Sequence, residues 1–520
     1  MPIRMVEDPN DQDPADNGPG GGGGGGGRGG LGSLLPMLFG LIFRYPKLII
    51  PALIVGGVLF FWKGGCNMLP SGGDDSQKAA FATGDVLDPK EYAKSDIFNF
   101  LYEDNKANPL PEAVTLAEYA PKRGNQGAQG SCVAWSNAYA IRTILYARQT
   151  GKNPDDVAFS PSYLYNNIKI DENCQGSYIQ RAVDWMQKNG AVPLSEFPYD
   201  PNTCSRQVPG NLRDMATNFT IKGAQRLGEN PQQGLKLQDI LQIKHAVAAG
   251  SPVAIGMMVG GSFMQDMVGQ KVWHPTSEDY DMSGFGGHAM TIIGYDDNLE
   301  GGALQIMNSW GTEWGKDGIA WVRYKDFVHF TREAYAYAPM GKAGEVMPEK
   351  FEAEFGLVNS STKEEIALVH NGKGMYSTEK PVTKGTPFKI HIKNNLECYT
   401  YVFGQETDNT CYVLYPYTAK HSPYCGVTGT RVFPRGFNMV PDDKGKRDFM
   451  AVLITRKPIN YEKIRDAVNS RPDADFAAAF RLAMVGNLSS SAKFTDGKKV
   501  AVSAPASDEA AILVTIAVDK

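Results

Sequence analysis

The stretch NQGAQGSCVAWSNAYA, Asn125 to Ala140, places a cysteine between a glycine-rich turn and an apolar segment. Behind Cys132, apolar side chains recur at helical spacing, which predicts a buried helix that begins at or just before the cysteine; they are Ala134, Ala138, Ile141 and Leu145. The N-terminus of a helix favours an anion, so this position lowers a thiol pKa and raises the fraction of reactive thiolate. A small buried core cysteine is the alternative interpretation. A base and an orienting group elsewhere in the chain would favour the nucleophile.

A second stretch supplies both groups. It reads GGHAMTIIGYDDNLEGGALQIMNSWGTEWGKDGIAWVRY and begins at Gly286. The apolar runs at 289–295 and 303–307 flank a turn-forming segment, which predicts a β-hairpin. Antiparallel pairing about a midpoint near Asn298 would bring His288 opposite Asn308. An imidazole beside an amide suits a cysteine nucleophile, because the imidazole takes the thiol proton and the amide oxygen holds the other ring N–H.

Several short motifs together resemble the papain-type cysteine peptidases. They are Gln126, GSC at 130–132, GHA at 287–289, NSWGTEWGKDG at 308–318, and the segments FSPSYLYNN, CQGS and VPLSEFPYDPNTC. The order Gln, Cys, His, Asn is that of the family, and the similarity covers roughly residues 111–339. The pairs GSCV and GHA are common in bacterial members. The resemblance implies an α+β, two-lobed papain-like domain over 110–341, with a helical left lobe and a β-barrel-like right lobe.

The same resemblance implies a function and a set of site residues. Cys132 would be the nucleophile, His288 the base and acid, and Asn308 the residue that orients the imidazole. Gln126 would donate to the oxyanion hole beside the backbone N–H of Cys132. The substrate cleft would be lined by Gly176, Ser177, Gly287 and Trp310. We therefore expect hydrolysis of peptide bonds in a peptide or protein substrate, through a thioester acyl-enzyme.

The chain departs from the family pattern near the nucleophile. The family has a cysteine three residues before the nucleophile and an aromatic residue after it, where this chain has Gln129 and Val133. The disulfide of that earlier cysteine is therefore absent, and Cys174 and Cys204 are expected to pair with each other in an oxidising compartment. The wide spacing between Cys132 and the later motifs indicates inserted loops around 260–286.

Composition limits the other functions. The chain has 520 residues and a net charge of −5, with no basic cluster, so we expect no nucleic-acid partner. It has seven cysteines but no CxxC pair and no HExxH motif, so neither a metal nor a cofactor is expected.

The first 109 residues indicate a membrane anchor. Residues 1–33 form a glycine-rich tail that is predicted to be disordered. Residues 34–63 are predicted to anchor the chain, with a transmembrane helix at about 46–62. Basic residues precede the span, which favours a cytoplasmic N-terminus and a periplasmic or extracellular catalytic domain. A cleaved signal peptide is the rival interpretation. Residues 64–109 are interpreted as a linker.

After the papain-like region, strand-like runs return over residues 342–520, which predicts a separate β-sandwich-like domain. Its tyrosines fit a sandwich core, with a ligand-binding face as the alternative. Two other functions are alternatives for the whole chain. A catalytically silent peptide-binding or scaffolding protein would need none of the four catalytic candidates, and a transglutaminase-like acyltransferase would carry aspartate in place of Asn308.

Overall fold

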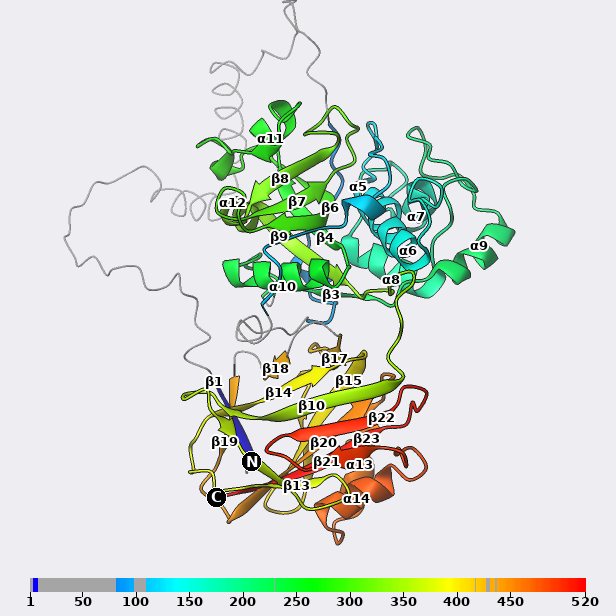
Figure 1. Ribbon diagram of the computed structural model, residues 1–520. Coiled ribbons are helices and arrows are strands. Elements are labelled where there is room, and N and C mark those ends of the chain that lie inside the picture. The colour runs from blue at the N-terminus through cyan, green and yellow to red at the C-terminus, as the bar shows by residue number, and fades with distance from the viewer. Residues whose placement is uncertain are drawn as a thin grey trace, which may run out of the picture. The chain divides into compact units, whose positions relative to one another are not determined.

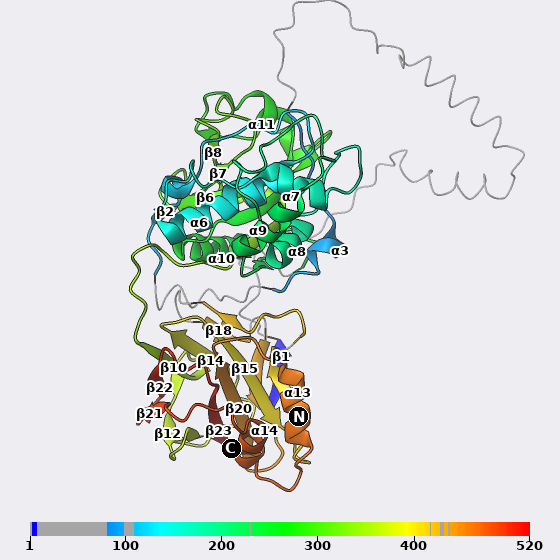
Figure 2. The same ribbon diagram turned by 90° about the vertical axis from the view of Figure 1, so that its right-hand side faces the viewer.

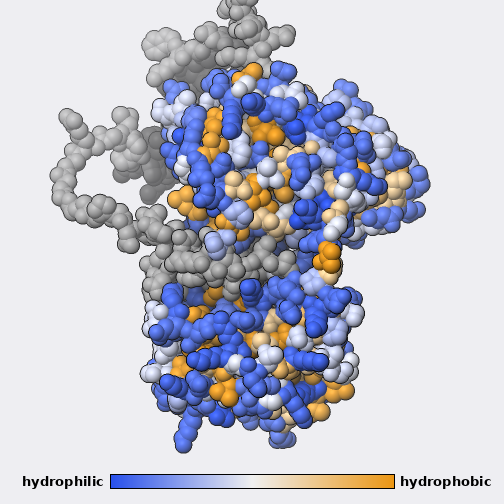
Figure 3. Space-filling model, in the orientation of Figure 1, coloured by the Kyte–Doolittle hydropathy of each residue, from blue (hydrophilic) through white to orange (hydrophobic). Residues whose placement is uncertain are grey.

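The computed structural model describes residues 3–7, 81–97, 109–228, 230–416, 418–426, 431–434 and 437–520 (Figure 1). The predicted anchor and most of the glycine-rich tail lie outside these ranges. Within the ranges, no helix combines the length and the apolar character that crossing a bilayer requires. Hydrophilic residues dominate the face shown in Figure 3, and apolar residues are scattered over it in small groups.

The helical lobe begins at the predicted helix, and Cys132 is its first residue. The lobe contains α5 (Cys132–Ala134), η6 (Trp135–Arg142), α6 (Thr143–Thr150), α7 (Pro161–Ile168), α8 (Ile179–Asn189), α9 (Gly210–Ala216) and η7 (Thr217–Phe219). The first three run on without a break, and η6 is a π-helical stretch, a feature found frequently at functional sites. Ser160 caps α7 by accepting a bond from the N–H of Tyr163, and Pro161 fits its first turn. Ile141 and Leu145 pack with Leu164 and Val183 in one apolar core.

The second lobe is built on one sheet with the strand order β3-β9-β4-β6-β7-β8-β5, and β2 pairs with β6. The strands are β2 (Ala113–Thr115), β3 (Ala224–Arg226), β4 (Val253–Val259), β5 (Val272–Trp273), β6 (Gly286–Asp296), β7 (Ala303–Met307), β8 (Ile319–Arg323) and β9 (Thr331–Tyr337). Its helices are η5 (Ala117–Tyr119), α10 (Leu237–Ala248), α11 (Gly261–Gln265), η8 (Asp279–Asp281) and α12 (Tyr324–Phe330). Three of these short elements, α11, β5 and η8, occupy the insertion expected at 260–286. In Figure 1, α5 to α8 lie to one side of this sheet.

Residues 64–109 are expected to be a linker, but residues 81–97 of this segment are part of the folded structure. These residues pack on the two-lobed domain and include α3 (Pro89–Tyr92). Tyr92 is fully buried, and its hydroxyl donates to the carbonyl of Ala334 at 3.2 Å. The N–H of Arg226 donates to the carbonyl of Asp96 at 2.8 Å. The apolar residues of this segment show no sustained helical or strand periodicity, so its docking could not be recognised from the sequence.

The C-terminal region contains two sheets, as the β-rich composition predicted. One has the order β1-β19-β14-β10-β22-β21 with β11 and β18 attached, and the other has the order β12-β13-β23-β20-β15-β16 with β17 attached. The strands of the first sheet are β1 (Ile3–Glu7), β10 (Lys350–Asn359), β11 (Glu365–Ile366), β14 (Phe388–Asn394), β18 (Arg431–Phe433), β19 (Phe437–Pro441), β21 (Lys493–Thr495) and β22 (Val500–Pro505). Those of the second are β12 (Leu368–His370), β13 (Met375–Thr378), β15 (Cys398–Gln405), β16 (Cys411–Tyr415), β17 (Tyr424–Cys425), β20 (Arg447–Thr455) and β23 (Ile512–Asp519).

Both sheets contribute to a single apolar core, which makes the region a β-sandwich. Phe355 and Ile390 of the first sheet belong to the same core as Val452 and Val514 of the second. Two helices, α13 (Tyr461–Asn469) and α14 (Phe476–Ala483), cover the outer face of the second sheet (Figure 2). They pack there in a separate apolar cluster, through Phe476 and Phe480 against Phe403 and Leu453.

Residues 3–7 differ from the predicted disordered tail, because they form strand β1. This strand pairs antiparallel with β19, with Met5 opposite Met439. Ile3 is buried in the sandwich core. An exposed strand edge can pair with any compatible extended segment. The five residues of β1 are too few for an alternation of apolar and polar side chains to be recognised in the sequence.

Candidate active site

Cys132 lies at the start of the helix α5, inside the domain, with Ser131 as the residue that precedes the helix. Its side chain has no exposed surface. The backbone N–H of Ala289, on strand β6, donates to its sulfur at 3.4 Å. Because Ala289 directly follows His288, this contact brings the thiol next to the histidine across the two lobes.

His288 and Asn308 meet through a direct hydrogen bond. His288 Nε2 and Asn308 Oδ1 are 2.8 Å apart, and the same oxygen accepts the N–H of Ser309 at 2.7 Å. The ring of His288 stacks on Trp310 with a centroid distance of 4.3 Å. The other ring nitrogen, Nδ1, has no hydrogen-bond partner among the described residues. The amide therefore fixes the orientation of the imidazole and leaves Nδ1 free for a proton.

The hairpin register differs from the predicted one. Asp296 pairs with Ala303, and a bulge follows between Ile292 and Gly294, so that Thr291 pairs with Met307. The midpoint therefore lies beyond Asn298, and His288 is a diagonal rather than a direct neighbour of Asn308. Diagonal pairs on one face of a sheet are still within reach of long side chains. A bulge adds one residue to one strand and cannot be located from a run of apolar residues alone.

Gln126 is fully buried near the start of helix α5. Its Nε2 donates to the carbonyl of Gln129 at 2.9 Å, and its Oε1 accepts the hydroxyl of Ser309 at 2.7 Å. Tyr199, which the sequence did not single out, supports the same loop. Its hydroxyl contacts Ser131 Oγ at 2.7 Å and donates to the carbonyl of Gln126 at 2.8 Å. Its place in the quoted segment VPLSEFPYDPNTC is the signal that could have identified it.

Residues 81–87, which we name the strap, lie across the site. Phe81 stacks on Trp310 with centroids 4.7 Å apart, and Trp310 Nε1 donates to the carbonyl of Ala82 at 2.8 Å. On the sheet side, the N–H groups of Gly84 and Asp85 both donate to the carbonyl of Gly287, at 3.2 and 3.1 Å.

On the helical side, the strap pairs with Ser177. The N–H of Val86 donates to the Ser177 carbonyl, and the N–H of Ser177 donates to the Gly84 carbonyl, each at 2.9 Å. Gly176 also approaches closely, because a Cβ at that position would lie 2.5 Å from the Gly84 oxygen. The four predicted cleft residues, Gly176, Ser177, Gly287 and Trp310, therefore all contact the strap.

Burial under the strap determines the charge of the site. Burial raises the pKa of the Cys132 thiol well above its ordinary range, and the negative charge of Asp85 raises it further. Burial lowers the pKa of His288 to about 4, although its bond with Asn308 opposes this shift. With the strap in place, the thiol and the imidazole are therefore both neutral.

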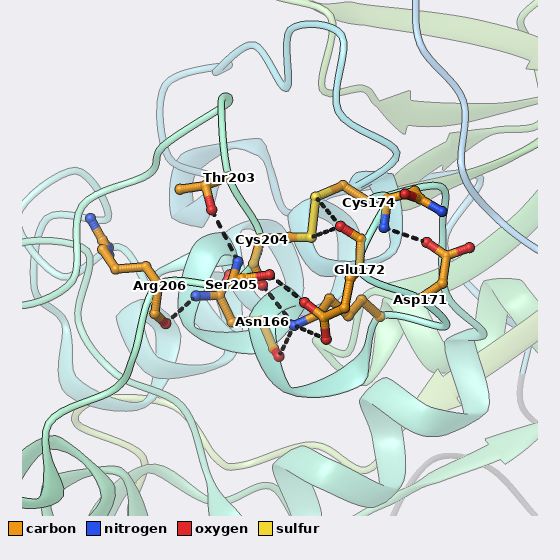
Figure 4. A network of polar contacts seen from close by, with 10 residues as sticks. Asn166, Asp171, Glu172, Cys174, Thr203, Cys204, Ser205 and Arg206 are labelled. Carbon is orange, nitrogen blue, oxygen red and sulfur yellow. Dashed lines mark hydrogen bonds and ion pairs between the residues drawn. A yellow bond between two sulfur atoms is a disulfide. The ribbon is translucent and has the colours of Figure 1, made fainter.

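Cys174 and Cys204 are joined by a disulfide in the helical lobe (Figure 4). The ammonium of Lys169 donates to the carbonyls of Asn166 and Cys204, at 3.2 and 2.9 Å, and pairs with Glu172 at 3.4 Å. This network ties the loop that carries Gly176 and Ser177 to the loop at 203–206. Within the described ranges, no group of three or more His, Cys, Asp or Glu side chains has a metal-binding arrangement.

Comparison with known proteins gives similarity over the two-lobed domain. Residues 112–340 match the sequence model of the papain family of cysteine proteases. Cysteine proteinase 3 of Entamoeba histolytica is 26% identical over 209 residues, which are 40% of this chain and 61% of that protein. Cathepsin K of Mus musculus is 26% identical over 223 residues, 42% of this chain and 62% of that protein.

The chain thus spans less than two thirds of the length of each of these two relatives. Among solved structures, xylellain, a cysteine protease from Xylella fastidiosa, is 24% identical with a TM-score of 0.40. That similarity covers 51% of this chain and 97% of xylellain.

Proposed function

We propose, on the premise that residues 112–340 form a papain-family cysteine peptidase domain, that this chain hydrolyses peptide bonds through Cys132, His288 and Asn308. The observation that carries the proposal is the contact between the two lobes at these residues. The His288–Asn308 bond of 2.8 Å leaves Nδ1 free, and the sulfur of Cys132 accepts the N–H of the residue that follows His288. A binding or scaffolding protein would need neither arrangement.

In the proposed reaction, Nδ1 of His288 takes the thiol proton of Cys132, and the thiolate attacks the carbonyl carbon of the substrate. The tetrahedral oxyanion accepts bonds from the backbone N–H of Cys132 and from the Gln126 side-chain amide, which must turn away from the Gln129 carbonyl. The imidazolium then protonates the leaving amine, and a thioester forms. Water, deprotonated by the same imidazole, hydrolyses the thioester and restores the thiol.

The docked strap makes the described state a latent one. Thiolate formation requires the site to gain water and to lose the negative charge of Asp85, since burial and that charge hold the thiol pKa high. When the strap leaves, both effects weaken, so the pKa of the thiol falls and that of the imidazole rises. Activity therefore depends on displacement of residues 81–87.

The test compares four single variants in a chain with a weakened strap, in which Phe81 and Leu87 are both serine. We expect Cys132→Ala and His288→Ala each to reduce hydrolysis of an unstructured protein substrate to near background. Gln126→Ala should reduce kcat by roughly 10²–10³ while the thiol still reacts with an alkylating probe, and Asn308→Ala should lose less than His288→Ala. Near-normal hydrolysis by a well-folded Cys132→Ala protein would overturn the proposal.

We further propose that the chain is a single-pass membrane protein of bacterial type, with a span at about 46–62, a cytoplasmic N-terminus and a periplasmic or extracellular catalytic domain. The support is the apolar run between basic and acidic flanks. In that topology residues 3–7 and β19 lie on opposite sides of the bilayer, so insertion into the membrane requires the β1–β19 ladder to separate.

One experiment decides the topology, because Met5 lies opposite Met439 in the ladder. In the Met5→Cys/Met439→Cys variant, no crosslink between these positions is expected in cells, as judged by peptide mass spectrometry. A reporter fused after Lys520 should at the same time give an external signal. An efficient crosslink would contradict the proposed topology.

A further inference from the structure

The turn at residues 126–131 carries both groups that would bind the substrate oxyanion. One is the side-chain amide of Gln126 at its start, and the other is the backbone N–H of Cys132, which directly follows the turn. In the family pattern, a disulfide begins at the position that Gln129 occupies here. This turn therefore needs another contact that holds both donors in place.

The hydroxyl group of Tyr199 contacts the turn at three points. It lies 2.7 Å from Oγ of Ser131, 2.8 Å from the carbonyl oxygen of Gln126 and 3.2 Å from Oε1 of Gln129. A phenol has one proton to donate and lone pairs that accept. The Ser131 hydroxyl therefore donates to Tyr199, and Tyr199 shares its own proton between the two glutamines. One atom thus connects the first, the fourth and the last residue of the turn.

Tyr199 is itself held from several sides. Its ring packs edge-on against Trp135 of η6, with centroids 4.8 Å apart. The N–H of the next residue, Asp200, donates to Oγ of Ser162 on α7 at 3.0 Å, and its carbonyl accepts Nε2 of Gln129 at 3.4 Å, a longer contact. The hydroxyl is thus fixed relative to the helices of the lobe, and it transmits their position to the turn.

All three partners of the hydroxyl are buried. Gln126 and Ser131 have no exposed surface, and Gln129 is 5% exposed. Burial raises the pKa of Tyr199 above its ordinary value of about 10, although the bond with Ser131 opposes the shift, so the hydroxyl keeps its proton at neutral pH. A hydrogen bond between buried groups is not replaced by one to water, so its loss leaves polar atoms of the turn without a partner.

We propose that Tyr199 and Gln129 form a polar clamp that positions the two oxyanion donors, in place of the disulfide of the family pattern. This inference rests on the proposed function, and it makes Tyr199 a positioning residue, because its hydroxyl contacts the turn and not the reacting atoms. Loss of the clamp lets the turn shift, so that the amide of Gln126 and the N–H of Cys132 no longer point to one position. A displacement of about 1 Å can reduce a rate by about 10², so loss of part of the clamp has a smaller but measurable effect.

The first experiment measures the clamp in hydrolysis, in the chain with the weakened strap. We expect Tyr199→Phe, which removes only the hydroxyl, to reduce kcat roughly tenfold and to change KM less than about twofold. Gln129→Leu, which removes one of the contacts, should reduce kcat roughly threefold. The control is Tyr146→Phe on α6, whose ring packs on other aromatic side chains of the helical lobe, and its kcat should be unchanged. An unchanged kcat in a folded Tyr199→Phe protein would overturn the inference.

The second experiment needs no hydrolysis, so it separates this inference from the proposed function. A peptide nitrile adds the thiol of Cys132 reversibly. The sulfur bonds to the nitrile carbon, the thiol proton passes to the nitrile nitrogen, and that nitrogen takes the place of the substrate oxyanion. In alkylation by iodoacetamide, the sulfur displaces iodide and no such group forms. We expect Tyr199→Phe to raise the Kd of the nitrile roughly tenfold, and Gln129→Leu roughly threefold, while the alkylation rate changes less than about twofold.

The two readouts together distinguish positioning of the donors from a merely structural role. Equal losses of nitrile affinity and alkylation rate in Tyr199→Phe would indicate a disturbed thiol and would overturn the inference, as would an unchanged Kd of the nitrile. If the wild type binds the nitrile but hydrolyses no peptide, the proposed function fails and the change in Kd still decides the inference. Peptide mapping distinguishes Cys132 from the free buried Cys398, Cys411 and Cys425.

Discussion

Two pairs of buried acids in this chain have opposite surroundings. In the sandwich, Asp442 and Asp448 both contact the ammonium of Lys520, at 2.9 and 2.7 Å, and all three side chains are at most 1% exposed. In the cleft, Asp85 and Glu333 are almost as deeply buried and contact no cation among the described residues. The pair in the sandwich core thus includes its own counter-charge, whereas the pair beside the strap has none among the described residues.

The pKa values follow this difference. Burial pushes the pKa of Asp442 and Asp448 upward, but the bonds with Lys520 oppose it, so Asp442 ends below its ordinary value and Asp448 at about 6. Burial raises the pKa of Asp85 and Glu333 with no cation to oppose it. Burial alone therefore does not decide the charge of an acid pair; the counter-charge does.

Removal of the cation from the Asp442–Asp448 pair should have the largest effect. We expect Lys520→Met to lower the free energy of unfolding of the sandwich by about 3–5 kcal/mol, because two buried acids lose their partner. All seven tryptophans precede residue 340, so urea unfolding followed by far-UV circular dichroism should shift while tryptophan fluorescence does not. The control Lys457→Met removes an exposed ion pair with Glu509 and should change stability by less than about 1 kcal/mol. If both variants lowered the free energy of unfolding equally, the buried cation of Lys520 would not be what stabilises the Asp442–Asp448 pair.

The pH should change how firmly the strap is docked, through the Asp85–Glu333 pair. Both carboxyl groups have raised pKa values in the docked state, so docking is fully stable below their ordinary values near pH 4 and weakens as the pH rises through the raised ones. Each unit of pKa difference corresponds to about 1.4 kcal/mol. Hydrogen exchange at the N–H of Val86, corrected for intrinsic rates, should accelerate as the pH rises above about 4. In Asp85→Asn the exchange rate should depend less on pH. Stronger docking of the strap at high pH would contradict the prediction.

A methyl group added at Gly256 should expel the strap. In Gly256→Ala the new Cβ would lie 2.4 Å from Asp85 and 2.6 Å from Leu87, and both contacts belong to the strap rather than to the sheet. We expect alkylation of Cys132 to become roughly tenfold faster, equivalent to about 1.4 kcal/mol. Gly210→Ala, with no atom within 4 Å of the new methyl group, is the control. An unchanged rate of Cys132 alkylation in a folded Gly256→Ala protein would mean that the space at Gly256 is not needed for docking of the strap.

Loss of the Tyr335 hydroxyl should have the smallest effect. Its contact with Glu333 is 3.4 Å, and the ring of Tyr335 packs against Tyr92 with centroids 5.1 Å apart. In Tyr335→Phe that packing remains, so we expect a change of less than about 1 kcal/mol in the free energy of unfolding. A much larger loss would mean that the buried Glu333 carboxyl group depends on this hydroxyl.

The sequence by itself determined the helix that begins at Cys132 and the hairpin that carries His288. It also gave the order Gln126, Cys132, His288 and Asn308, whose roles remain proposals. These features are local, since the helical and strand periodicities are read over a few turns or a few residues. The β-rich character of the C-terminal region followed from the same patterns.

Only the tertiary structure decided the hairpin register, the docking of residues 81–87 and the meeting of Asp85 with Glu333. A bulge shifts the register without altering the apolar pattern of either strand. A strap held mainly by its backbone N–H and carbonyl groups has no side-chain signature, because every residue type offers those groups. The two carboxyl groups come from distant segments and meet because Gly256 leaves room between them, a condition of packing in three dimensions that no local pattern contains.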